Sequence, residues 1–462
     1  MEIYTRLDEG IVDRIRNGVG GAAVVTDPEK LAAYGKDGTV AAFAMPELAV
    51  EPTNAAQVQA LLRLANRYRF PVIPRGLGTG LAGGAVPVRG GVVLSLAGMK
   101  RIVAIEPENM IAVVEPGVLN KDFKEAVRGC GLYYPPDPAS YDTCSLGGNA
   151  ATNAGGPSCV KYGVTRDYIL GLEAVLPSGE LIRTGVRTRK GVVGYDLTRL
   201  LVGSEGTLGV ITGLTLRLIP HPPAMTTLVA LFSGLRQAME AVRAVLMKGH
   251  IPSAAEFLDR RCLELVGDML PFPGAREAGA LLLIETDGAP EVISREIEAI
   301  GLICSDGGAG QVLMAPDARR REQMWEVRRA VSLRIEEKYP VDLHEDVVVP
   351  LGRIADFVAG LPEVERRHDM KIYAFGHAGD GNIHLNITAD RPEARARVEG
   401  GIEEILIRVL DMGGTISGEH GIGYLKKTFL PLELSPRSME IQRAIKMLFD
   451  PANILNPGKV FT

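Results

Sequence analysis

Apolar positions in the first half of the chain predict one clear helix and a series of short strands. Apolar residues recur at helical spacing from Val58 to Ala65, and Asn54 can cap this helix, which we expect to end near Tyr68. Residues 1–50 are expected to form short helices and loops. Apolar runs bounded by turns predict strands at residues 70–75, 90–99, 101–105, 111–114, 169–176, 181–184 and 209–218.

The pattern changes after the proline-rich stretch at residues 219–223, which is a natural domain boundary. From there on, strands alternate with longer helices, which predicts an α+β domain built from packed layers. The predicted strands are residues 228–232, 281–285, 311–314, 341–349, 372–375 and 384–387. The predicted helices are residues 235–248, 290–300, 318–338, 354–368, 393–411 and 437–449.

The chain has 462 residues, about three times the length of a typical domain, so several domains are expected. We divide it into residues 1–222, residues 223–415 and a C-terminal segment, residues 416–462. Hydrophobic residues make up 46% and charged residues 23%, which is ordinary for a globular protein. The net charge is −5 and no basic tract is present, which argues against a nucleic-acid partner.

Cysteine usage and hydropathy indicate a reducing compartment. The five cysteines form no CxxC pair, so neither a disulfide framework nor an iron–sulfur or zinc–cysteine site is expected. The first residues are charged and lack a signal-peptide core, and no run of 18 apolar residues suggests a transmembrane helix. We therefore expect a cytoplasmic protein, whose association with a membrane would have to come through a partner.

Glycine is the compositional outlier, with 54 residues, or about 12% against an average near ~7%. The glycines cluster at residues 76–98 and 147–163. Gly78, Gly80 and Gly83 match the dinucleotide fingerprint, but the loop continues into a predicted strand instead of a helix, which excludes a Rossmann site. Successive amides in such a loop can still bind phosphate groups, so we favour phosphate or cofactor binding over a flexible surface loop.

Histidines and carboxylates cluster in two further glycine-rich motifs. His377 and His384 are separated by a turn that can bring both imidazoles together at the ends of two strands, and Asp380 is expected to serve that turn. Glu419 and His420 follow in the motif GEHG. Two histidines and a carboxylate suit Zn²⁺, Mn²⁺ or Fe²⁺, whereas the alternative is a pair of histidines that only hydrogen-bond within a turn.

The predicted helix at residues 318–338 presents an arginine that needs an anion. Trp325, Arg328 and Ser332 share one helix face, which the tryptophan marks as partly buried. Arg328 can hold a substrate carboxylate, and the alternative is an internal ion pair. Arg329 and the three arginines at 319–321 are expected to be solvated.

Seven motifs together resemble the FAD-linked oxidases of the vanillyl-alcohol-oxidase/p-cresol-methylhydroxylase fold, in the D-lactate dehydrogenase and glycolate oxidase large-subunit group. The motifs, in chain order, are PRGLGTGLAGG, PPDPAS, SLGGNAATNAGGPSCVKYG, LLVGSEGTLGVIT, GHAGDGNIH, SGEHGIG and NPGK. The resemblance implies an α+β protein with a two-subdomain FAD-binding domain (residues 1–222). It further implies an α+β cap or substrate domain with an antiparallel sheet (residues 223–415) and a C-terminal segment that returns to the FAD domain.

The resemblance also implies non-covalent FAD, because the first glycine loop holds Thr79 and no histidine for covalent attachment. The implied cofactor-binding residues are Pro74, Arg75, Gly76, Gly78, Thr79, Gly80, Pro136, Asp137, Ser140, Gly147, Gly148, Asn149, Asn153, Gly156, Glu205, Gly209, Ile211 and Asn456. Residues 75–80 would wrap the pyrophosphate, the second cluster would line the flavin, Glu205 and its neighbours would surround the adenine and ribose, and Asn456 would return to the flavin domain.

For the chemistry, the resemblance implies a divalent metal on His377, His384 and Glu419, with His420 as general base and Arg328 holding the substrate carboxylate. The implied reaction is oxidation of a D-2-hydroxy acid, most simply D-lactate, to the 2-oxo acid. Relatives that act on hydroxyglutarate carry a lysine near the position of His344, so a smaller monocarboxylate is favoured.

Several alternatives stay open at this point. The substrate could instead be glycolate or D-2-hydroxyglutarate, and the electron acceptor an electron-transferring flavoprotein, an iron–sulfur subunit, a cytochrome or oxygen. Outside this reaction class, the chain could be a non-catalytic FAD-binding scaffold subunit, although its His-x₆-His and Glu-His motifs argue against that. A metal hydrolase without flavin is the third alternative.

Overall fold

The computed structural model describes residues 4–39, 41–270 and 274–461, and the chain divides into two compact units. Unit 1 comprises residues 1–154, 164–221 and 419–462, and unit 2 comprises residues 155–163 and 222–418. The sequence analysis assigns residues 155–163 to the first domain, whereas the structure groups them with unit 2. The reason is a side-chain anchor, because Lys161 and Tyr162 both bind the buried carboxylate of Asp287 in unit 2.

Unit 1 begins with a small sheet in the order β1-β2-β4-β3, in which β2, β4 and β3 are parallel. Its elements are α1 (Glu9–Val19), β1 (Val24–Val25), α2 (Pro28–Tyr34), β2 (Leu48–Val50), α3 (Ala55–Tyr68), β3 (Val72–Arg75) and β4 (Val92–Ser95). The predicted helix is confirmed as α3, since the Asn54 side chain caps it by accepting from the Gln57 amide. Helices α1 and α3 bury one face of this sheet and α2 the other.

The second sheet of unit 1 is antiparallel, in the order β5-β6-β10-β8-β9. Its strands are β5 (Ile102–Glu106), β6 (Ile111–Val114), β8 (Ile169–Val175), β9 (Leu181–Gly185) and β10 (Val210–Arg217). The shorter elements of this part are α4 (Asn120–Arg128), β7 (Leu132–Tyr133), α5 (Leu146–Thr152), α7 (Leu197–Leu201) and β11 (Ile219–Pro220). All five strands of the sheet match predicted ones to within two residues at each end.

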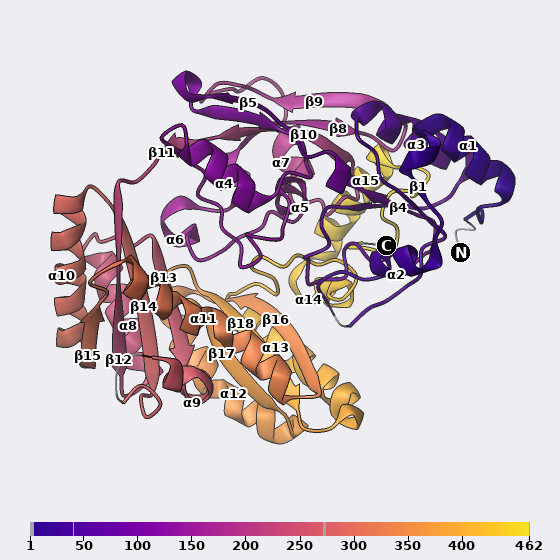
Figure 1. Ribbon diagram of the computed structural model, residues 1–462. Helices are drawn as coiled ribbons and strands as arrows, with labels where there is room; N and C mark the ends of the chain where they lie inside the picture. The colour runs from indigo at the N-terminus through magenta and orange to yellow at the C-terminus, as the bar shows by residue number, and fades with distance from the viewer. Residues whose placement is uncertain (1–3, 40, 271–273, 462) are drawn as a thin grey trace. The chain divides into compact units, whose positions relative to one another are not determined.

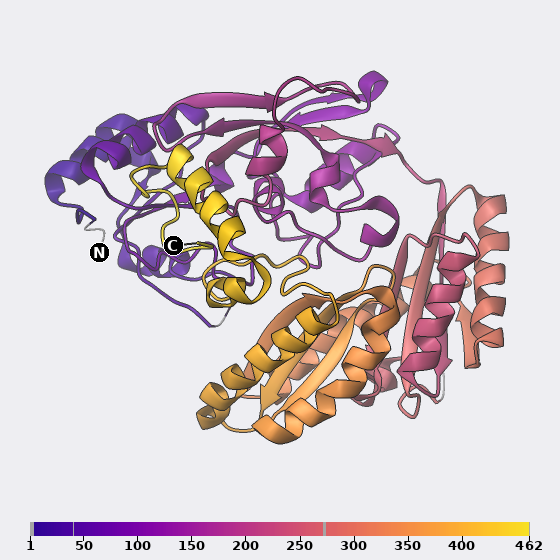
Figure 2. The same ribbon diagram turned by 180° about the vertical axis from the view of Figure 1, so that it is seen from behind.

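The C-terminal segment of unit 1 contains α14 (Leu430–Glu433) and α15 (Pro436–Phe449). Figure 2 shows it in yellow, running among the elements formed by the first half of the chain. After α15 the chain reaches β3, where Leu455 bridges Val72 and the Asn456 amide donates to the Val72 carbonyl. The last residues of the chain therefore pack next to the first glycine-rich loop, which leaves β3.

Unit 2 is built on a seven-stranded antiparallel sheet in the order β15-β12-β14-β13-β17-β18-β16 (Figure 1). Its strands are β12 (Ala224–Phe232), β13 (Ala254–Asp259), β14 (Ala280–Gly288), β15 (Ala309–Met314), β16 (Val341–Val348), β17 (Lys371–His377) and β18 (Asn382–Ala389). Its helices are α6 (Cys159–Tyr162), α8 (Leu235–Met247), α9 (Arg260–Val266), α10 (Pro290–Asp306), α11 (Ala318–Lys338), α12 (Ile354–His368) and α13 (Arg395–Asp411). Strand β13 and helices α6 and α9 were not predicted from the sequence.

Helices cover both faces of this sheet. Apolar side chains of α9 and α11 pack against one face, where they share a core with residues of β12, β13, β14 and β17. Helices α8, α10, α12 and α13 contact the strands and one another on the opposite side. No helix in the described part of the chain is both long and apolar enough to cross a membrane.

Candidate active site

The first glycine-rich loop, residues 76–84, joins the parallel strands β3 and β4. No helix follows it, so the structure agrees that it is not a Rossmann loop. Within the described residues, the backbone amides from Leu77 to Gly84 donate no hydrogen bond, and a side chain at Gly80 would meet only open space. This row of free N–H donors suits an anion such as a pyrophosphate.

Two other segments approach this loop so closely that glycine is required. A Cβ atom at Gly76 would lie 2.6 Å from Ser145 Oγ and 3.3 Å from the Gly148 Cα, so the two glycine clusters are in contact. Gly206 has a φ of 67°, and a Cβ there would lie 3.2 Å from the Pro74 ring. The first glycine loop, the segment around Gly148 and the segment around Gly206 are therefore brought together within unit 1.

Asn456 and Glu205 connect the end of the glycine-rich loop, at Gly84, to other segments of unit 1. The Asn456 side-chain amide donates to the carbonyl oxygens of Gly84 (3.0 Å) and Glu205 (2.8 Å). The Glu205 carboxylate accepts from the amides of Ile422 and Gly423, each at 2.8 Å, and burial raises its pKa although these amides oppose the shift. Both residues thus tie chain segments together, and Glu205 also lines a cavity of about 310 Å³.

Several buried side-chain atoms in unit 1 lack a hydrogen-bond partner among the described residues: Asn120 Oδ1, Arg166 Nε and Asn149 Nδ2. Asn149 is 4% exposed, and its side-chain Nδ2 makes no hydrogen bond there. By contrast, Asn153 accepts from the Arg166 amide, and the Arg75 guanidinium donates to the Lys36 carbonyl. The other predicted cofactor residues in this unit are Gly78, Thr79, Pro136, Asp137, Ser140, Gly147, Gly209 and Ile211, while Gly156 belongs to unit 2. A free buried donor beside free backbone amides fits a cofactor rich in acceptors, as FAD is.

Unit 2 carries the histidine motif at the ends of two neighbouring strands. His377 closes β17 and His384 lies in β18, and their Nε2 atoms are 3.3 Å apart, as the turn between them predicts. Asp380 accepts from the Asn382 amide and so serves the turn, also as expected. Two imidazole nitrogens that face each other at this distance can share either a proton or a metal ion.

Glu256, on the unpredicted strand β13, joins this motif to the arginine helix. It is 1% exposed, its Oε1 lies 2.5 Å from His377 Nδ1, and its Oε2 accepts from Arg328 Nε at 2.7 Å. Burial acts to raise the pKa of Glu256, but His377 and Arg328 outweigh it and hold that pKa below its ordinary value. The Arg328 guanidinium also lies over the Phe375 ring, 4.7 Å from its centroid.

Asp346, on β16, anchors the segment that leads to Glu419. It is fully buried, and its Oδ1 accepts from Asn382 Nδ2 at 2.6 Å. Its Oδ2 accepts from Ser417 Oγ at 3.2 Å and from the Gly418 amide at 2.9 Å. Asp346 is also the register partner of His384, and a ligand atom of each lies within 4.8 Å of the other.

Glu419 and His420 follow Gly418 directly in the chain and begin the last segment of unit 1. Within unit 2, Asp346 and His384 each bring one possible metal-ligand atom to this strand pair. The sequence analysis names His384 as a ligand and does not mention Asp346. The alternation Asp342, His344, Asp346 along one strand face is the local signal that could have found Asp346.

On the rest of α11, the tryptophan face agrees with the expectation but one of the arginines does not. The face with the single tryptophan is partly buried, since Trp325 Nε1 donates to Glu285 at 2.9 Å. Arg321 is not solvated as expected, because its Nε donates to the same buried carboxylate at 2.6 Å. The neighbouring arginines 319, 320 and 329 are exposed.

The His344 side chain is hydrogen-bonded to a residue of its own strand, β16. Its Nε2 lies 3.0 Å from Asp342, whose carboxylate also accepts from Asn386 Nδ2. Burial acts to lower the pKa of His344, but Asp342 and the nearby carboxylates of Glu336 and Glu345 raise it above its ordinary value. No lysine stands here to receive a second substrate carboxylate.

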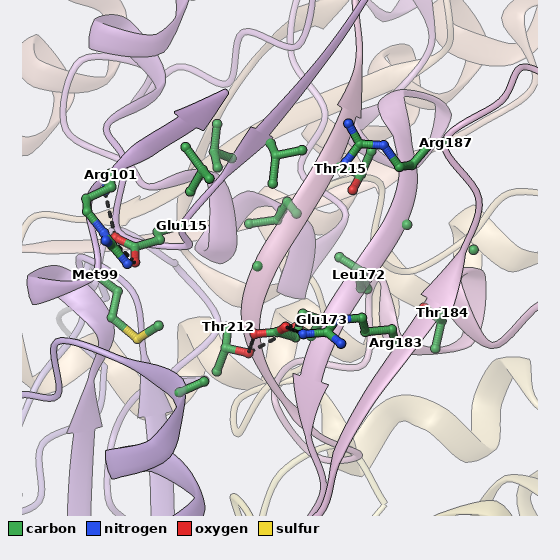
Figure 3. A pocket seen from close by; sticks show the side chains of 18 of the residues that line it. Met99, Arg101, Glu115, Leu172, Glu173, Arg183, Thr184, Arg187, Thr212 and Thr215 are labelled. Carbon is green, nitrogen blue, oxygen red and sulfur yellow. Dashed lines mark hydrogen bonds and ion pairs between the residues drawn. The ribbon is translucent and has the colours of Figure 1, made fainter. Parts of the chain in front are cut away.

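A further hollow of about 530 Å³ lies on the five-stranded sheet of unit 1 (Figure 3). Its charged side chains are paired, Arg101 with Glu115, Arg183 with Glu173 and Arg187 with Glu106. Thr212 Oγ1 also donates to Glu173. No predicted site residue lines this hollow, and its charges are already neutralised in pairs.

Two protein families match this chain. Residues 46–185 match the family described as FAD binding domain, and residues 221–460 match the family described as FAD linked oxidases, C-terminal domain. The second match spans more than half of the chain.

Three curated relatives are similar over nearly their whole length. The glycolate oxidase subunit GlcD of Bacillus subtilis (strain 168) is 41% identical, with 93% of this chain and 92% of the relative covered. D-lactate dehydrogenase of Anaerostipes hadrus is 38% identical (94% and 91%), and D-2-hydroxyglutarate dehydrogenase of Stutzerimonas stutzeri (strain A1501) is 32% identical (98% and 99%). Among solved structures, p-cresol methylhydroxylase superposes with a TM-score of 0.83 at 19% identity, over 99% of this chain and 98% of that one. The predicted fold class is thereby confirmed.

Proposed function

This chain belongs to the FAD-linked oxidases and is a flavoprotein oxidoreductase, and on that premise we propose that it oxidises a D-2-hydroxy acid to the 2-oxo acid. D-lactate is the substrate we favour. The observation that carries the proposal is the pair of imidazole nitrogens, 3.3 Å apart, beside an arginine held by a buried glutamate. Glycolate and D-2-hydroxyglutarate are the alternatives, which the names of two relatives support.

The residues of unit 1 fit FAD, and His377 and His384 of unit 2 fit a divalent cation such as Zn²⁺, Mn²⁺ or Fe²⁺. The free amides of residues 77–84 and the Asn149 side chain would hold FAD without a covalent bond. His377, His384 and Glu419 would hold the cation, while Asp346 braces the turn that precedes Glu419. FAD supplies a two-electron acceptor, and the cation supplies a Lewis acid that lowers the pKa of a bound hydroxyl group.

Oxidation of a 2-hydroxy acid removes a hydride from Cα and a proton from the hydroxyl group, and two side chains of this protein assist. Arg328 binds the substrate carboxylate through its two terminal nitrogens, since its Nε is already used by Glu256. A neutral imidazole has one ring nitrogen with a free lone pair, so His420 can take the hydroxyl proton on that nitrogen as general base.

The surroundings of His344 favour a small monocarboxylate. A dicarboxylate such as 2-hydroxyglutarate needs a second cation, and His344 is already bonded to Asp342. The electrons must then leave the protein, and the cysteines of this chain form no cluster motif that could carry them. We propose a separate acceptor protein, either an electron-transferring flavoprotein or an iron–sulfur subunit, which is consistent with a relative named as a subunit.

A dye-linked assay tests the substrate. We expect the highest kcat/KM with D-lactate and little turnover of L-lactate, with glycolate and D-2-hydroxyglutarate measured in parallel. Thorough treatment with a chelator should abolish turnover, and added divalent metal should restore it. A clear preference for glycolate or D-2-hydroxyglutarate would replace D-lactate as the substrate, and no activity on any of the four would reject the proposal.

A further inference from the structure

We propose that Glu256 is a positioning residue for this reaction, whose two carboxylate oxygens orient His377 and Arg328 at the same time. The inference rests on the proposed function, because it concerns the metal ligand and the carboxylate-binding arginine of that site. Glu256 is buried, with 1% of its surface exposed. Its two carboxylate oxygens lie 2.5 Å from His377 Nδ1 and 2.7 Å from Arg328 Nε.

The fold sets this arrangement through three separate elements. In the sheet, Glu256 of β13 is the register partner of His377 at the end of β17. Helix α11 packs on the same face of the sheet and supplies Arg328, 72 residues further along the chain. One carboxylate thus connects a strand end and a helix, so the positions of the two functional side chains depend on each other.

On the histidine side, Glu256 determines which ring nitrogen carries the proton. A carboxylate next to His377 Nδ1 accepts a hydrogen bond, so this nitrogen bears the proton and a neutral ring keeps its lone pair on Nε2. That Nε2 atom faces His384 Nε2 at 3.3 Å. Histidines that bind metals commonly donate their other ring N–H to a carboxylate in this way, which fixes the ring and raises its basicity.

On the arginine side, Glu256 accepts a hydrogen bond only from Nε of the Arg328 guanidinium group. Nε of Arg328 donates to Glu256, while the two terminal nitrogens make no hydrogen bond within the described residues. The Phe375 ring lies beneath the guanidinium plane and limits its rotation. The guanidinium group is planar, so fixing Nε also fixes the direction in which the two terminal nitrogens point. These two nitrogens remain available to bind a substrate carboxylate.

A second buried carboxylate on the same sheet face provides a matched control. Glu285 of β14 is 8% exposed and accepts from Thr227, Arg321 and Trp325, but it contacts no histidine. Replacing it by glutamine therefore removes a buried charge and disturbs a similar ion pair without touching either functional side chain.

The test is Mn²⁺ binding to the resting full-length protein, measured by electron paramagnetic resonance without substrate. The E256Q side chain keeps the shape of glutamate, but only its amide oxygen can accept a hydrogen bond. His377 and Arg328 both donate to position 256, so one of them loses its acceptor. We expect E256Q to bind Mn²⁺ about 10- to 100-fold more weakly than the wild type. It should also raise KM for the substrate, because Arg328 loses its anchor, and E285Q should change neither quantity.

The possible results distinguish a failure of the Glu256 role from a failure of the proposed function. Equal Mn²⁺ affinity and equal KM in E256Q and the wild type would overturn the role of Glu256 and leave the proposed function standing. A loss of affinity shared by E285Q would equally overturn it, because the effect would then be general. A wild-type protein that binds no Mn²⁺ would overturn the proposed metal site itself. Melting curves of all variants show whether each one is folded.

Discussion

At the residue scale, buried carboxylates hold the functional side chains in place. Glu256 binds His377 and Arg328, and Asp346 binds the amide of Gly418, the residue before Glu419. Burying such a charge is costly unless it is fully paired, and each of these carboxylates accepts from at least two donors. Buried carboxylates with several donors therefore hold the neighbouring functional side chains in position.

The role of His420 can be tested by substitution. H420N should lower turnover by roughly 10²–10⁴-fold, the contribution that a general base typically makes, while FAD stays bound. Turnover is measured with the dye-linked assay and FAD content from the flavin absorbance. The control is H250N, since His250 lies in unit 2 beside Glu296 and outside the candidate site. Unchanged turnover in H420N would remove His420 from the mechanism.

Part of this site could be read from the sequence and part could not. His377, His384 and Arg328 stand out because motif spacing and helical spacing are local patterns. Glu256 does not, because a glutamate in a strand is tolerated there only through partners 72 and 121 positions away. Long-range pairing of this kind leaves no signal in the neighbouring residues.

At the element scale, the prediction is most accurate for two long helices of unit 2 and for the five-stranded sheet of unit 1. The bounds of α11 and α12 agree with the expectation to the residue, and the Asp317 side chain caps the start of α11. Strand β13 and helix α9 were missed, since the strand has Ala254 and Glu256 on its buried positions instead of a strong apolar run. The missed strand is the one that carries Glu256.

The cap of α3 gives a direct test at this scale. Asn54 accepts from the Gln57 amide at 3.1 Å, so N54A leaves one helix N–H without its partner. We expect a loss of about 0.5–2 kcal/mol of stability, seen as a lower melting temperature in a scan that follows flavin fluorescence. N54D keeps a capping oxygen and should melt close to the wild type. Equal melting of N54A and N54D would contradict this account of the cap.

At the scale of the whole molecule, the candidate residues are divided between the two units. Unit 1 contains the free loop amides, Asn149, Glu419 and His420, and unit 2 contains His377, His384, Glu256 and Arg328. The two-part organisation follows from the proline-rich boundary near residue 221, but the transfer of residues 155–163 to unit 2 does not. It depends on the ion pair between Lys161 and Asp287, which are 126 positions apart.

The most direct test of the central claim is a single turnover without air, in which D-lactate is mixed with enzyme and the flavin absorbance is followed. The account predicts rapid bleaching by the metal-loaded enzyme, at least tenfold slower bleaching after thorough metal removal, and recovery when Mn²⁺ is restored. The FAD content must be equal in all three samples. Bleaching at the same rate with and without metal, or no bleaching by any D-2-hydroxy acid, would contradict it.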